Sequence, residues 1–134
     1  MIKTIAFLKC KAGLSREAFI RYYETRHAPL ILSIAPQVCD YRRNFLVAEG
    51  AIMAPGAAAP DFDVVTELWY PDEGAFAAAM AAFTDPANAQ RIAADEEHLF
   101  DRARTRFFVV EERRSAITDP ADRQNAATRP IKRG

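Results

Sequence analysis

The sequence predicts an α+β fold of the ferredoxin-like type, in which a βαββαβ chain forms one four-stranded antiparallel sheet. The first observation is the order of apolar patterns, which is strand, helix, strand, strand, helix, strand. The second is size, because 134 residues, 50% of them hydrophobic and 27% charged, suit one domain with its own core. The third is the polar composition of the C-terminal residues, which divides the chain into a domain at 1–113 and a tail at 114–134. We expect this tail to be disordered or to be an arm that lies on a partner subunit.

Four segments have the residue pattern of β-strands, at 2–9, 38–47, 62–70 and 105–111. Both faces of the first strand are apolar, so both sides of the sheet should be covered. The helices of this fold cover only one side. The sequence therefore predicts a homodimer in which two sheets pack face to face.

The first helix should begin after Ser15, a good N-cap, and continue to about Ile34. Pro29 has no N–H to donate to the carbonyl of Thr25, so we expect a kink or a change of pitch just after His27. Apolar residues recur every three or four positions, which places His27 on the stripe that faces the core. The members of this stripe are Phe19, Ile20, Tyr23, His27, Leu30, Ile31 and Ile34.

Two further helices are predicted between the third and fourth strands. Asp72 caps the first of them, which continues to Phe83, and Asp85 caps a second that ends at roughly Asp101. The run at 50–60 consists almost entirely of Ala, Gly and Pro, and it predicts a long mobile hairpin loop.

Charge and composition exclude several classes of protein. The 18 Lys and Arg balance the 18 Asp and Glu, so no basic excess predicts a nucleic-acid partner. No apolar run approaches the length of about 20 residues that spans a bilayer, and the start of the chain has the pattern of a strand instead of a signal peptide. Two Cys and two His give neither a disulfide framework nor a metal-ligand motif. We therefore expect a cytoplasmic protein without a bound metal. The sequence also has no nucleotide-binding glycine motif, and we expect no cofactor.

Several segments together have the pattern of one known family: Ile2 to Lys9, Leu14 to Phe19, Tyr22 to Leu30 with a His-x-Pro element, Tyr41 to Asn44, Asp63 to Tyr70, and Ala94 to Phe100. Through these segments the sequence resembles the EthD-domain family over most of residues 1–112. The resemblance implies a dimeric α+β barrel, with a pocket in each subunit between helix and sheet. Members of the wider superfamily include isomerases, polyketide cyclases and dehydratases, and cofactor-free monooxygenases, so the resemblance implies a small apolar ligand without choosing a reaction.

His27 is the candidate catalytic residue. Imidazole titrates near neutral pH and transfers protons without a metal, which suits enolisation, isomerisation, dehydration or aldol-type cyclisation. The alternative is a buried structural histidine that stabilises the kinked turn. Tyr23, one turn earlier, and Tyr41 are candidates to hydrogen-bond a substrate oxygen, and Tyr22 is a weaker one.

Three more residues are candidates for substrate binding. Glu67 and Trp69 share one face of the third strand, where an acid beside an apolar pocket would have a raised pKa. The alternatives are an ion pair of Glu67 with a neighbouring arginine, and a core or interface role for Trp69. His98 is a candidate second proton-transfer group, or else a surface histidine near the end of a helix.

These residues predict a cofactor-independent acid–base enzyme, of the lyase or isomerase type, for a small apolar oxygenated molecule. Two alternatives remain open at this point. One is a cofactor-free monooxygenase of phenolic substrates. The other is a protein without catalytic activity that binds a hydrophobic ligand or assists another enzyme.

Overall fold

The fold is α+β with one four-stranded antiparallel sheet, as the sequence predicts. A computed structural model describes residues 1–128. The strand order is β2-β3-β1-β4, and every neighbouring pair is antiparallel. The strands are β1 (Ile2–Leu8), β2 (Asp40–Phe45), β3 (Val64–Tyr70) and β4 (Arg106–Val110).

The first helical run combines three segments: α1 (Arg16–Tyr22), a π-helical turn (Tyr23–His27) and α2 (Ala28–Ile34). The N–H of Ala28 donates to the carbonyl of Tyr23, five residues earlier. The predicted change of pitch is present, but it spans Tyr23–His27 instead of beginning after His27. The helix widens in this turn because Pro29 supplies no N–H and because its ring would crowd the preceding turn of an α-helix. Tyr23 and His27 both turn into the core, with exposed fractions of 0% and 5%.

The second pair of helices is α3 (Glu73–Thr84) and α4 (Pro86–Glu96), capped by the side chains of Asp72 and Asp85 as predicted. The helix expected to continue to residue 101 ends at Glu96. Beyond it, the chain leaves the helix to pair with the segment after β1, where Cys10 bridges Phe100. Leu99 and Phe100 are buried there, which explains why this pairing displaces another helical turn.

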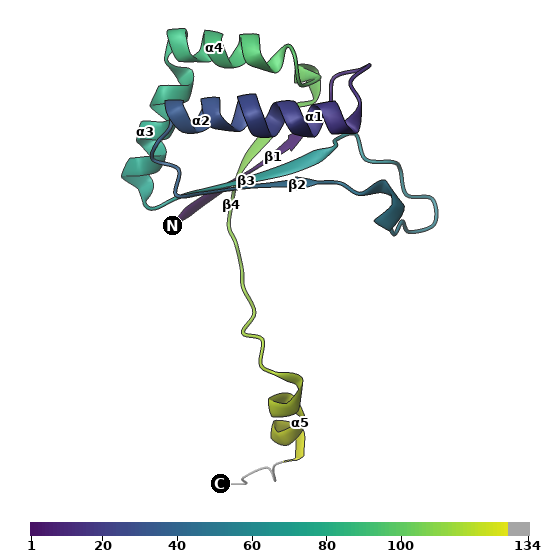
Figure 1. Ribbon diagram of the computed structural model, residues 1–134. Coiled ribbons are helices and arrows are strands. Elements are labelled where there is room, and N and C mark those ends of the chain that lie inside the picture. Colours follow the sequence, from purple (N-terminus) through teal and green to yellow (C-terminus); the bar gives the residue numbers. More distant parts are fainter. Residues whose placement is uncertain (129–134) are drawn as a thin grey trace.

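The core lies between the sheet and these helices, which cover one side of the sheet (Figure 1). Side chains alternate strictly in β3, where Val64, Thr66, Leu68 and Tyr70 are buried and the residues between them are half-buried. The buried set faces the helices. The other set lies on the opposite side of the sheet, which we call the outer face and which none of the described helices from α1 to α4 covers.

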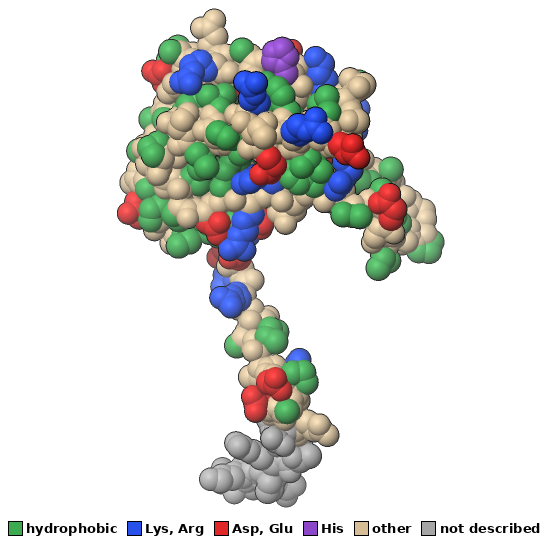
Figure 2. Space-filling view, in the orientation of Figure 1, with side chains coloured by type: hydrophobic (Ala, Val, Ile, Leu, Met, Phe, Trp, Pro, Cys, Tyr) green, Lys and Arg blue, Asp and Glu red, His purple; other side chains and the backbone are tan. Residues whose placement is uncertain are grey.

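The loop between β2 and β3 begins with a short 3-10 turn (Ala48–Gly50) and then runs without regular structure to β3. It projects beside the sheet, with hydrophobic side chains over its surface (Figure 2). Ile52 is 98% exposed. The loop expected at 50–60 is therefore confirmed as a loop.

The C-terminal tail contains a helix that the sequence analysis does not expect, α5 (Pro120–Thr128). The side chain of Asp119 accepts a hydrogen bond from the N–H of Ala121 in the first turn of this helix. Pro120 occupies the first position of the helix, where a proline is favourable. Figure 1 shows α5 at the end of an extended segment, away from the sheet. The part of the tail at 129–134 lies outside the described residues, and the domain boundary at 113 stays a prediction. Within the described residues, no helix has both the length and the apolar character needed to cross a membrane.

Candidate active site

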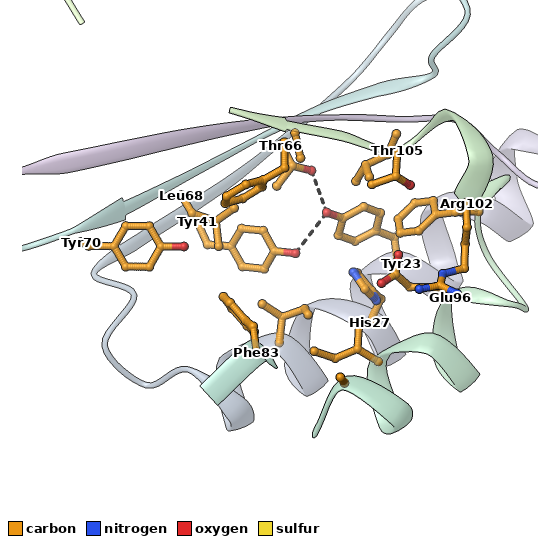
Figure 3. A pocket seen from close by; sticks show the side chains of 17 residues that line it. Tyr23, His27, Tyr41, Thr66, Leu68, Tyr70, Phe83, Glu96, Arg102 and Thr105 are labelled. Atoms are coloured by element: carbon orange, nitrogen blue, oxygen red, sulfur yellow. Dashed lines mark hydrogen bonds between the residues drawn. The ribbon is translucent and has the colours of Figure 1, made fainter. Parts of the chain in front are cut away.

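A cavity of about 280 Å³ lies between the inner side of the sheet and helices α2, α3 and α4. Most of its wall is apolar, and a few polar groups converge on it (Figure 3). The exposed members of the lining are Arg102, Thr105 and Phe107, which marks the side on which the cavity opens. The lining residues are Ala6, Leu8, Tyr23, His27, Ile31, Tyr41, Thr66, Leu68, Tyr70, Phe83, Ala89, Ile92, Glu96, Phe100, Arg102, Thr105 and Phe107.

His27 is paired with a carboxylate from the last turn of α4. Its Nδ1 atom lies 2.7 Å from Oδ2 of Asp95, and the side chains of the two residues are 6% and 13% exposed. An ionised carboxylate only accepts hydrogen bonds, so Nδ1 carries the proton. The other carboxylate oxygen accepts a 2.8 Å hydrogen bond from the hydroxyl of Tyr22. Nε2 of His27 is thus the ring nitrogen left for a ligand in the cavity.

The electrostatics of His27 favour a neutral ring. Burial lowers the pKa of His27, and Asp95 offsets part of that decrease. A neutral imidazole with Nδ1 protonated has a free lone pair on Nε2. This is the form of histidine that can accept a proton.

Three hydroxyl groups form a chain along the sheet side of the cavity. The oxygen of Tyr23 lies 2.7 Å from Oγ1 of Thr66 and 3.0 Å from the oxygen of Tyr41. Three hydroxyl protons serve two hydrogen bonds, so one proton at an end of the chain remains to be donated. Burial raises the pKa of Tyr23 to about 12 and raises the pKa of Tyr41 as well, which keeps both groups protonated near neutral pH.

Glu96 follows Asp95 at the end of α4 and lines the cavity itself. Burial raises the pKa of its carboxyl, Arg102 opposes this rise, and Asp95 adds to it. Figure 3 shows Glu96 and Arg102 at the same end of the cavity. This end therefore holds both an acid and a permanent positive charge.

The structure brings His27, Tyr23 and Tyr41 together but places Glu67 and Trp69 elsewhere. These two residues lie on the outer face of the sheet, away from the cavity. Glu67 accepts from Lys3 at 2.8 Å and from the side-chain amide of Asn44 at 3.1 Å, and the bond from Lys3 lowers its pKa. The ion pair weighed for Glu67 thus exists, with a lysine instead of an arginine.

Trp69 has its ring between two cations of the outer face. Lys3 Nζ lies 4.5 Å from the centroid of the indole and the Arg42 guanidinium lies 4.9 Å from it. His98 is exposed beside Tyr22, with 6.2 Å between the ring centroids, and does not line the cavity. Neither residue shares a site with His27.

A model of the EthD domain family matches residues 11–103. The chain belongs to the EthD family. An EthD-family protein from Bacillus halodurans is similar to this chain at 19% identity and a TM-score of 0.56, with 84% of this chain and 100% of that one covered. The protein At3g17210 from Arabidopsis thaliana is similar at 13% identity and a TM-score of 0.61, with 87% and 100% covered. No curated protein matches the sequence.

SnoaB, a cofactor-independent oxygenase from Streptomyces nogalater, is similar to this EthD-family chain at 14% identity. The TM-score is 0.51, with 85% of this chain and 94% of that one covered. A dimeric protein is also among the matched structures of ferredoxin-like fold. At such identities the likeness shows the fold alone.

Several polar groups of this EthD-family site are not predicted from the sequence, among them Asp95, Glu96 and Tyr70. A signal for Asp95 exists, because it follows Ile92 by three positions and precedes Leu99 by four, which places it on the core side of its helix. Tyr70 shares its strand parity with Leu68. No comparable pattern points to Arg102.

Within residues 1–128, no cluster of three or more His, Cys, Asp or Glu side chains is arranged to hold a metal ion.

Proposed function

We propose that this EthD-family protein is a cofactor-independent acid–base enzyme that acts on a small, apolar, oxygen-bearing molecule. The observation that carries the proposal is the pair of His27 and Asp95, 2.7 Å apart, at the wall of a largely apolar cavity of about 280 Å³. A proton acceptor held in one tautomer beside an apolar space suits proton abstraction from carbon.

His27 is the general base in this proposal. Its Nε2 atom takes a proton from a carbon next to a carbonyl group, and the positive charge that forms on the ring is stabilised by Asp95. The lowered pKa of His27 keeps the ring neutral, and so ready to accept a proton, near neutral pH.

Two further groups complete the reaction. The carbonyl becomes an enolate, whose oxygen receives the spare hydroxyl proton of the chain at Tyr41 as a hydrogen bond. Glu96, with its raised pKa, returns a proton to a second position of the substrate. Abstraction and return at different atoms give isomerisation. If Glu96 instead protonates a departing hydroxyl, water leaves and the result is dehydration. If the enolate attacks a second carbonyl and Glu96 protonates the alkoxide that forms, the result is cyclisation.

The test is hydrogen–deuterium exchange of 2-tetralone in D₂O, followed by ¹H NMR. This ketone has two rings, one carbonyl and acidic protons beside it. We expect the protein to accelerate exchange above the buffer rate and His27→Gln to abolish the acceleration. His98→Gln, which changes the exposed histidine, is the matched control and should exchange like the unaltered protein. Undiminished exchange with His27→Gln contradicts the proposal.

A second candidate is a cofactor-free monooxygenase of phenolic compounds, favoured by the fold that this chain shares with SnoaB. Here His27 deprotonates a phenol, and the electron-rich anion reacts with O₂. The CH₂ group of an anthrone then becomes a C=O group, and the second oxygen atom leaves as water. Oxygen uptake with dithranol and formation of a quinone would favour this reaction over the first. Binding of either probe without turnover would favour a ligand-binding or accessory protein.

We also propose that two copies pair through their outer faces. Apolar side chains from three neighbouring strands gather there, with Phe7 and Phe108 in edge contact at 6.0 Å between centroids. Phe108 is 49% exposed in the single chain. A face of this kind, on a fold with known dimeric members, supports a homodimer.

A further inference from the structure

We propose that the cavity has a second polar subsite at Tyr70, which hydrogen-bonds a hydroxyl or carbonyl oxygen at the far end of the ligand. This inference rests on the proposed function, and it narrows the substrate class. The substrate has an apolar body and carries an oxygen at both ends, one near His27 and the other at Tyr70.

The first observation is an unpartnered hydroxyl. Tyr70 has an exposed fraction of 0%, lines the cavity, and has no hydrogen-bond partner for its oxygen in the described part of the chain. Its ring is held by Phe76, with 5.3 Å between the centroids. A buried hydroxyl without a partner destabilises a fold, which phenylalanine at this position would avoid.

The second observation is the direction of that hydroxyl. Figure 3 shows the oxygen of Tyr70 on the side of its ring that faces Tyr41. Thr4, on the neighbouring strand, has a buried hydroxyl near it, but neither group makes a hydrogen bond of normal geometry within residues 1–128. Burial raises the pKa of Tyr70, and Thr4 offsets part of the rise. Tyr70 is therefore a neutral donor and acceptor, suited to a hydroxyl or a carbonyl.

The third observation is the distribution of polar groups along the cavity. Tyr70 lies at the end opposite Glu96 and Arg102 (Figure 3), and the latter is exposed at the mouth. Leu68 and Phe83 lie in the wall between the two ends. Among the lining residues that the structure describes, Arg102 is the only lysine or arginine, so the closed end offers no positive charge for a carboxylate. An uncharged oxygen fits this end best.

The experiment compares two probes that differ by one oxygen, 2-naphthol and 2,6-dihydroxynaphthalene, in fluorescence titrations. We expect the unaltered protein to bind the diol about five- to tenfold more tightly, the effect of one net hydrogen bond. Tyr70→Phe should remove this preference and leave the affinity for 2-naphthol unchanged. Tyr22→Phe is the matched control, because that hydroxyl bonds to Asp95 outside the cavity lining, and it should keep the preference.

Three results would overturn the inference. In the first, neither probe binds the unaltered protein. In the second, Tyr70→Phe loses the same affinity for both probes. In the third, that variant keeps the full preference for the diol. Thermal unfolding gives a second measurement. Tyr70→Phe should unfold at the same or a higher temperature, and a Tm lower by several degrees would show that the hydroxyl serves the fold.

The outcome is separable from that of the proposed function. His27→Gln should lose exchange of 2-tetralone and keep the preference for the diol. A preference that survives in a protein without any exchange activity would retain the subsite and refute the acid–base proposal. Exchange activity without the preference for the diol would support the acid–base proposal and refute the subsite.

Discussion

Asp95 holds Nδ1 of His27 at 2.7 Å from one carboxylate oxygen, while Tyr22 donates to the other. The carboxylate thus joins the end of α4 to the π-helical turn. In the proposed reaction this contact does two things: it selects the tautomer with Nε2 free, and it stabilises the protonated ring.

Asp95→Asn should slow the exchange of 2-tetralone by about 100-fold, because the amide neither stabilises the imidazolium nor requires a proton on Nδ1. The apparent pKa in the rate profile should also fall, since Asp95 raises the pKa of His27. Tyr22→Phe removes only one hydrogen bond to the carboxylate and should slow exchange by less than about tenfold. A profile unchanged in Asp95→Asn would mean that this contact has no part in proton transfer.

The lowered pKa of His27 predicts a pH dependence of stability. In the pH range between the folded pKa and the unfolded value, about 6.5, the unfolded chain binds more protons than the folded one at this site. The free energy of unfolding should therefore rise with pH through that range, and the contribution of His27 should be constant above and below it. Urea unfolding at pH 5, 6 and 7.5 measures this slope. His27→Gln should have a smaller slope, and an equal slope in both proteins would refute the assignment.

Glu96→Gln should have opposite effects on stability and activity. Burial raises the pKa of Glu96, so the folded state loses stability as this carboxyl ionises with rising pH. The amide cannot ionise, so the variant should be more stable at pH 7 and lose this advantage at acid pH. Its rate in the proposed isomerisation should fall because the proton donor for the second position is gone, while exchange of 2-tetralone needs only His27. Glu97→Gln, on an exposed neighbour, is the control and should change neither property. A less stable Glu96→Gln at pH 7 would contradict the burial argument.

The sequence predicts positions on a face better than it predicts partners. Helical spacing places His27 and Tyr23 toward the sheet, and the structure buries both. The partner of His27 is 68 residues away along the chain, and no spacing rule connects two elements that meet only in the folded state. Glu67 and Trp69 lie away from the cavity, and the sequence could not predict this for a related reason. Their strand parity was assigned correctly, but both faces of the sheet carry apolar residues, so parity alone does not say which one meets the helices.

Phe108→Glu should convert a dimer into a monomer. Light scattering of the unaltered protein should give twice the chain mass of 15.0 kDa, because the exposed aromatic side chains around Phe108 on the outer face would be covered by a partner. A carboxylate at position 108 would lose its hydration in the sheet-to-sheet interface and so favour dissociation. Leu32→Glu is the matched control, since Leu32 is 40% exposed, compared with 49% for Phe108, but lies on α2 on the other side of the molecule. A stable monomer at micromolar concentration, or dissociation by Leu32→Glu alone, would show that the outer face is not the interface.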